Sequence, residues 1–161
     1  FEHLFQESPH LVATLHGPQH VFESVNPAYV RLLRRDTTGL TFREGQPEAE
    51  PSGLFELLDR VYASGETVKS REHPVRVAGR LGYFNFIIAA RRDWEGRVDG
   101  VTLLATDLTE VVRARRAAET AHRELREFIA QFPSPMCLFQ GPELVFTLVN
   151  DAVIHCTAKR E

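Results

Sequence analysis

Short apolar blocks separated by turn residues mark the first two thirds of the chain. Residues 11–16 and 20–25 flank Gly17-Pro18, which predicts two short strands joined in a hairpin. Residues 81–91 and 98–106 form a second, longer pair of blocks around another turn sequence. A hairpin at each end indicates an antiparallel sheet.

Helical patterns lie between the two hairpins. Asn26-Pro27 is a typical helix start, since Asn caps the free N–H groups and Pro suits the first turn. It predicts a helix over about 27–34, with Val30 and Leu33 facing inward. The stretch 36–51 is polar and rich in Gly, Pro and Glu, and no helix or strand is predicted there.

A second helix is predicted from apolar residues at i, i+3, i+4 and i+7. Ser52 can cap its start, and Gly65 suits its end, where a left-handed residue is favoured. Residues 67–77 then read as a strand near a sheet edge because they contain Pro74. The element order predicts an α+β fold, a five-stranded antiparallel sheet with helices on one face. The residues of the helical stripe are Leu54, Leu57, Leu58 and Val61.

An internal repeat defines the organisation of the chain. Residues 17–28 reappear as residues 141–152 at a constant offset of 124, with seven of the twelve positions identical. Upstream, Ser8-Pro9 matches Ser134-Pro135 if a gap of two residues is allowed. We therefore expect one domain over 1–107, a helical connector over 108–130, and the truncated opening of a second copy over 131–161.

Composition and charge narrow the possible partners. The 161 residues carry 19 basic and 22 acidic side chains, a net charge of −3, which argues against nucleic acid or an anionic membrane as main partner. No apolar run approaches the roughly 20 residues of a membrane span. The two cysteines, Cys137 and Cys156, give neither a disulfide framework nor a metal site, and a cytoplasmic location is expected. The chain reads as a piece of a longer protein.

Four short motifs in this order resemble the PAS fold, closest to the sensory-box domains of bacterial signalling proteins. They are Ser8-Pro9, Asn26-Pro27-Ala28-Tyr29, Arg92-Asp93-Trp94-Glu95-Gly96 and Asp107-Leu108-Thr109-Glu110. The resemblance covers about 5–110 and again 132–161. It implies that the sheet cups a small molecule or nothing, and that the flanking helices carry the output.

The resemblance also implies a ligand pocket on one face of the two long strands. By strand alternation the pocket candidates are Phe84, Phe86, Ile88, Val101, Leu103 and Ala105. The same side chains could instead fill the core. No cofactor is required, and an unidentified small molecule remains open. Flavin is not expected, because the reactive-cysteine motif of the flavin photoreceptors is absent. Haem is not expected either, because His73 reads as an exposed edge histidine.

The connector carries an a/d seam over nearly three heptads. It begins after the signal junction Asp107, Leu108, Thr109 and Glu110, where Asp107 or Thr109 can cap the helix. A parallel homodimer is expected through it; the alternative is a monomeric helix lying on its own sheet. The seam residues are Val111, Ala114, Ala118, Ala121, Leu125 and Phe128.

No catalytic or metal constellation is present in the sequence. Ala121–Arg126 resembles a histidine-kinase phosphoacceptor helix only in part, because Arg123 follows His122 and no Thr-Pro follows. The sequence therefore predicts a sensory and dimerisation module without catalytic activity. A histidine kinase is the expected output; a diguanylate cyclase, a transcriptional regulator, or a ligand-free interaction scaffold are the alternatives.

Overall fold

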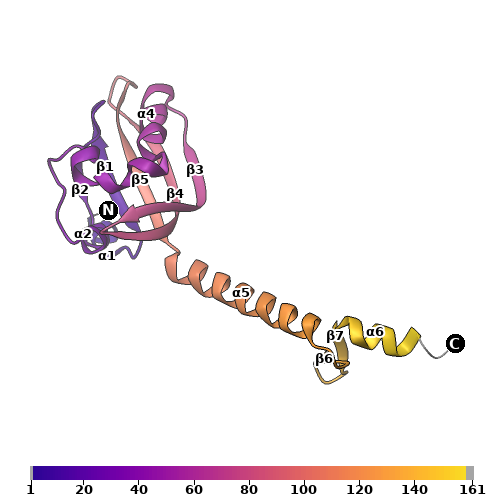
Figure 1. The fold of residues 1–161 in the computed structure, drawn as a ribbon. Coiled ribbons are helices and arrows are strands. Elements are labelled where there is room, and N and C mark those ends of the chain that lie inside the picture. The colour runs from indigo at the N-terminus through magenta and orange to yellow at the C-terminus, as the bar shows by residue number, and fades with distance from the viewer. Residues whose placement is uncertain (1, 159–161) are drawn as a thin grey trace. The chain divides into compact units, whose positions relative to one another are not determined.

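The computed structural model describes residues 2–158, which form two compact units divided after Val112. The first unit contains a five-stranded antiparallel sheet in the order β2-β1-β5-β4-β3 (Figure 1). Its elements are α1 (Glu2–Glu7), β1 (Leu11–His16), β2 (Val21–Val25), α2 (Pro27–Leu33), α3 (Phe42–Gly45), η1 (Pro47–Ser52), α4 (Leu54–Ser64), β3 (Val68–Val77), β4 (Arg80–Arg92) and β5 (Val98–Asp107). The α+β fold and the antiparallel sheet predicted from the sequence are confirmed.

The two hairpins form as expected. Strand β1 pairs with β2 on one side and with β5 on the other, and β4 joins β5 to the edge strand β3. Pro74, which has no N–H to donate, lies on β3 opposite Tyr83. The edge position predicted for this strand is therefore correct.

Helix α2 begins where Asn26-Pro27 predicted. The Asn26 Oδ1 accepts a hydrogen bond from the Tyr29 N–H, and Arg34 ends the helix in the left-handed conformation. The prediction of which α2 residues face inward is only partly correct. Ala28 and Tyr29 are buried, whereas Val30 and Leu33 are half-buried.

Two short helices occupy the polar stretch that was read as irregular. Helix α3 carries a capping box, in which Thr41 and Glu44 each accept a hydrogen bond from the other's backbone. Its single large apolar residue, Phe42, is buried and stacks on Phe22 at 5.5 Å between ring centroids. The 3₁₀ helix η1 follows and buries Ala49. Because the outer residues of both helices are polar, neither helix shows an apolar periodicity in the sequence.

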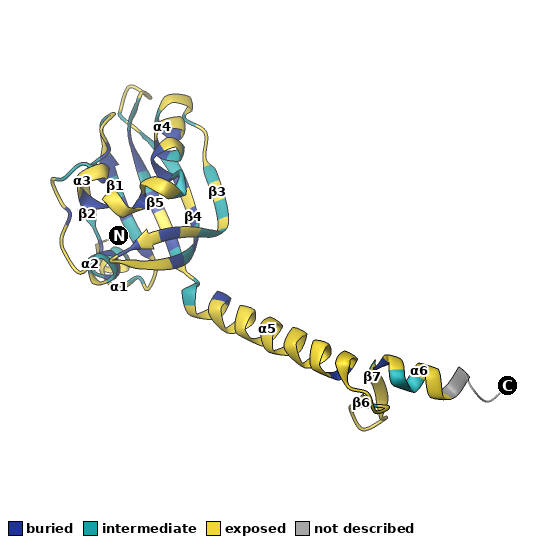
Figure 2. Cartoon of the chain, viewed as in Figure 1, coloured by how far each residue is buried: buried dark blue, intermediate teal, exposed yellow. Residues whose placement is uncertain are grey.

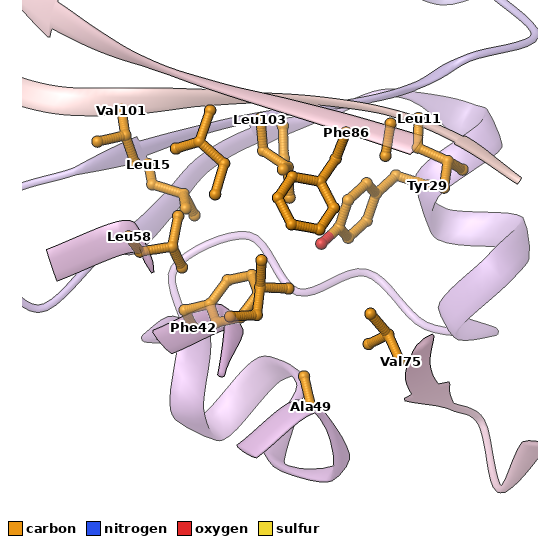
Figure 3. Close-up of a cluster of buried hydrophobic side chains, with 14 of the residues drawn as sticks. Leu11, Leu15, Tyr29, Phe42, Ala49, Leu58, Val75, Phe86, Val101 and Leu103 are labelled. Carbon is orange, nitrogen blue, oxygen red and sulfur yellow. The ribbon is translucent and has the colours of Figure 1, made fainter. Parts of the chain in front are cut away.

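Helix α4 buries the predicted stripe except for Leu57, which is half-buried. Gly65 takes the left-handed conformation at its C-terminus, as predicted. The N-cap differs: Gly53 holds that position, and the Ser52 hydroxyl accepts from the Leu54 N–H beside it. Figure 3 shows Leu58 among the buried side chains of the core.

The connector helix is α5 (Thr109–Gln131), and it leads into β6 (Cys137–Gln140), β7 (Val145–Val149) and α6 (Asp151–Ala158). Strands β6 and β7 form their own antiparallel pair. Its register, Cys137 opposite Val149 with an irregularity between Leu138 and Phe139, repeats that of β1 and β2 at the offset of 124. The repeated sequence therefore adopts the same hairpin twice.

The repeat extends upstream at the same offset, without the gap that the Ser-Pro match required. The Asn26 Nδ2 donates to the carbonyl of His10, and the Asn150 Nδ2 donates to that of Ser134. Ser134 is thus the counterpart of His10, not of Ser8. The hydrogen bonds of the buried Asn define the structural alignment better than the dipeptide does.

Candidate sensory core and helix junction

The six pocket candidates from β4 and β5 all lie on one face of the sheet and are all buried. Alternation along β4 leaves Tyr83, Asn85 and Ile87 more exposed than their neighbours. The helices α2, α3, η1 and α4 supply the other side of this core, which Figure 3 shows in close-up.

A small apolar cavity of about 30 Å³ lies inside this core. Phe84, Phe86, Leu103 and Ala105 line it, whereas Ile88 and Val101 pack elsewhere in the core. Such a volume accommodates about one or two water molecules, compared with roughly 300–1,000 Å³ for a typical small-molecule pocket. An organic ligand would therefore have to displace side chains that now fill the space.

Tyr29 and Gln46 provide the polar groups of the cavity wall, and the sequence search did not single out either of them as a site residue. The Tyr29 hydroxyl donates to the Gln46 Oε1 at 2.9 Å, and both residues are buried. Burial raises the pKa of Tyr29 well above its ordinary value of 10.0, because the phenolate would lose its hydration. The Asn-Pro-Ala-Tyr motif could have drawn attention to Tyr29. Gln46 lies in the polar stretch 36–51, where no sequence pattern marks it.

The signal junction connects the end of β5 to the start of α5. The Asp107 carboxylate accepts from the N–H and the hydroxyl of Thr109, so Asp107 makes the contact at the helix start. The Leu108 N–H donates to the Tyr83 carbonyl at 2.8 Å, and the Tyr83 N–H donates to the Thr109 Oγ1 at 3.1 Å. Glu110 is exposed in the first turn. The helix start is thereby attached to β4 as well as to β5.

The predicted seam of α5 is exposed at all six positions (Figure 2). Val111 is 64% exposed, Leu125 45% and Phe128 58%, although water disfavours large apolar side chains. The adjacent Val112 and, near the helix end, Ile129 are buried. The helix thus carries an apolar stripe that the other described residues of the second unit leave uncovered.

His73 is less exposed than the sequence predicts. His73, read from the sequence as an exposed edge residue, is partly buried, and its Nε2 lies 2.7 Å from the Ser52 carbonyl oxygen. Its Nδ1 lies 3.1 Å from the Ser70 hydroxyl, and its ring packs edge-on against Phe86. His73 therefore connects the edge strand to η1. Within residues 2–158, no three His, Cys, Asp or Glu side chains gather as a metal site would require.

The comparisons identify the family. The family model of the PAS fold matches residues 5–113, and the chain belongs to this family. The five-stranded sheet and the helix after it are those of a PAS sensory module.

Solved structures agree with this assignment. A VqmA–ligand–DNA complex from Vibrio cholerae is 29% identical, with a TM-score of 0.55 over 67% of this chain and 50% of its own. The PAS domain of Bordetella pertussis BvgS is 19% identical (TM-score 0.57; 75% and 93% covered). A sensory box sensor histidine kinase from V. cholerae is 20% identical (TM-score 0.50; 66% and 83%). The last two show the fold alone, and the chain spans about half the length of VqmA.

Proposed function

We propose that the domain is a sensory and dimerisation module that passes the state of its core to an output domain through α5. The observation that carries this proposal is the junction. One residue of β4, Tyr83, holds both junction residues through its own backbone: its carbonyl accepts from the Leu108 N–H, and its N–H donates to the Thr109 hydroxyl. Its neighbour Phe84 lines the core cavity. A change at the cavity wall therefore acts on the strand that positions the helix.

A second copy of the chain is the proposed occupant of the exposed seam. Apolar residues with spacings of three and four along one helix are typical of a coiled-coil contact. Three of the six are alanines, which allow close approach but bury little apolar area. A parallel helix pair of this kind can rotate or slide at modest cost, as a signalling contact requires.

The variant Leu125→Glu tests the dimer by placing a charge in the seam. Leu125 is an a position, and a buried carboxylate without a partner opposes association. We expect a monomer by light scattering where the parent is a dimer. Thr120→Glu makes the same charge change at a c position and should leave the dimer intact. A parent chain that is monomeric at high concentration, or variants that behave alike, would contradict the proposal.

The size of the cavity favours a second candidate function, a ligand-free interaction scaffold. A core with about 30 Å³ of space has no room for an organic molecule in this conformation. Native mass spectrometry and an absorbance spectrum of the purified protein separate the candidates. A retained small molecule supports ligand sensing, whereas an apo mass with partner-dependent binding supports the scaffold.

A histidine kinase is the proposed output, as for the V. cholerae sensory box protein. A transcriptional regulator and a diguanylate cyclase are the alternatives. A further VqmA structure concerns DNA binding by LuxR-type receptors, and another similar structure is that of an RNA-binding receptor. These likenesses weaken the expectation, drawn from the net charge of this chain, that nucleic acid is not a main partner. No helix within residues 2–158 is long and apolar enough to cross a membrane; the cytoplasmic location stays a prediction.

We also propose that residues 131–161 represent the opening of a second PAS domain. The repeated hairpin register and the repeated buried Asn support this. Leu15 and Phe22 are fully buried in the first unit, but their counterparts Phe139 and Phe146 are 46% and 60% exposed. An apolar hairpin face of this kind requires a covering layer. Limited proteolysis should cut after residue 131 well before it cuts within 11–107.

A further inference from the structure

Gly82 lies between the core cavity and the start of α5. A Cβ atom at this position would lie 2.7 and 2.9 Å from the Phe84 ring and 3.0 Å from the Thr109 Oγ1. Contacts under about 3 Å are shorter than van der Waals packing permits. Gly82 has no left-handed backbone that would itself call for glycine. Glycine is needed here because the side chains of Phe84 and Thr109 occupy the space that a Cβ would take.

The two side chains that meet at Gly82 belong to different parts of the proposed mechanism. Phe84 is buried and lines the cavity. Thr109 is the first residue of α5 and bonds both Asp107 and Tyr83 through its hydroxyl. Phe84 is also the register partner of Asp107 across β4 and β5. Three successive β4 residues, 82–84, thus contact three successive junction residues, 107–109.

We propose that Gly82 is the contact through which a displacement of the Phe84 ring reaches Thr109 and loosens the start of α5. This inference rests on the proposed sensory function and specifies how its signal leaves the core. An occupant that enlarges the cavity displaces the ring, and the ring edge already fills the place that a Cβ on residue 82 would take. Movement in that direction presses on Thr109, which weakens its bonds to Tyr83 and Asp107.

The variant Gly82→Ala tests the contact because its methyl group imposes the same pressure without a ligand. Amide hydrogen exchange of the full chain, read by NMR, is the measurement. We expect exchange at Tyr83 and Leu108 to rise about fivefold, the factor that the loss of one net hydrogen bond gives. Exchange at Asn26, whose N–H donates to Val12 in the first hairpin, should stay unchanged.

A second substitution shows whether the ring is part of the path. Phe84→Leu removes the ring atoms that the new methyl group would meet, so Gly82→Ala with Phe84→Leu should recover most of the protection at Leu108. Phe84→Leu alone should shift the amide signals of Leu108 and Thr109, which keeps the test valid if Gly82→Ala fails to fold.

Three results would overturn the inference. These are unchanged junction exchange in Gly82→Ala, a uniform rise over the whole domain, or no recovery in the double variant. The experiment needs neither ligand nor dimer. A monomeric or ligand-free protein would therefore disprove the proposed function while leaving the Gly82 contact open to the same measurement.

Discussion

At the scale of single residues, Tyr29 brings a buried hydroxyl into the wall of the core cavity. It comes from the first turn of α2, and its hydroxyl reaches the side chain of Gln46, just past the end of α3. A buried hydroxyl without a partner costs about 1–3 kcal/mol, so this pair stabilises the join between two helices only while both members are present. The same burial links the deprotonation of Tyr29 at alkaline pH to the stability of the fold.

The pH prediction for Tyr29 follows from its raised pKa. Below pH 10 the tyrosine is neutral in both the folded and the unfolded state, so it makes the free energy of unfolding neither rise nor fall with pH. Above pH 10 the unfolded chain releases the proton while the folded chain keeps it, so stability falls by about 1.4 kcal/mol per pH unit. Denaturant unfolding from pH 9 to pH 11 should show no change from this group below about pH 10 and this fall in stability above it.

The substitution Tyr29→Phe should remove most of the alkaline slope while lowering stability at neutral pH. Tyr83→Phe, at a partly exposed position on the other face of the sheet, is the matched control and should retain the slope. Equal slopes in the parent and in Tyr29→Phe would show that Tyr29 does not control the alkaline transition.

At the scale of elements, the sequence predicted those that have a strong local signal. The apolar spacing of α4, the Asn26-Pro27 start of α2 and the edge strand with Pro74 all follow from local physics. Helix α3 and η1 could not be predicted in this way. Helix α3 buries one large apolar side chain, Phe42, which packs on Phe22 and Phe55 outside the helix, and η1 buries only Ala49.

For the candidate site, the sequence predicted which strand residues are buried but not the volume that they enclose. Alternation along β4 correctly placed Phe84 and Phe86 on the buried face. The volume left between them depends on Tyr29 and Leu32 from α2 and on Val75 from β3, which share the cavity wall. Their packing is tertiary, so neither the size of the cavity nor the position of Gly82 beside it could be read from the strand pattern.

Gly100 gives a prediction about the sheet itself. A Cβ at this position in β5 would lie 2.2 Å from the backbone oxygen of Leu15 in β1. The backbone of a paired strand cannot move aside cheaply, so Gly100→Ala should separate β5 from β1 and cost about 3 kcal/mol or more, the upper end of the range for overpacking. Gly96→Ala, at a turn with open space and a left-handed φ, should cost only about 1 kcal/mol. Thermal unfolding of both variants measures the difference, and similar losses would contradict the packing argument.

At the scale of the whole chain, one hairpin design appears in two surroundings. The first is covered by the helices of its own domain, whereas Leu144, Val145 and Phe146 of the second are each more than half exposed. An isolated two-stranded hairpin is marginally stable in water. The second unit therefore owes much of its order to Asn150, which follows β7 and whose side chain bonds Ile129 at the end of α5 and the segment just before β6.

The paired variants Asn26→Ala and Asn150→Ala compare these surroundings directly. Both side chains are buried, and each bonds backbone groups before and after its hairpin. Asn26→Ala should destabilise the first unit by about 3 kcal/mol, because several buried backbone groups lose their partner. Asn150→Ala should leave that unfolding transition unchanged and raise amide exchange only within 132–158, since the chain divides into two compact units. If Asn150→Ala lowers the main transition as much as Asn26→Ala does, the two repeats fold as one cooperative body, and the repeated hairpin is part of the first domain's stability rather than the opening of another.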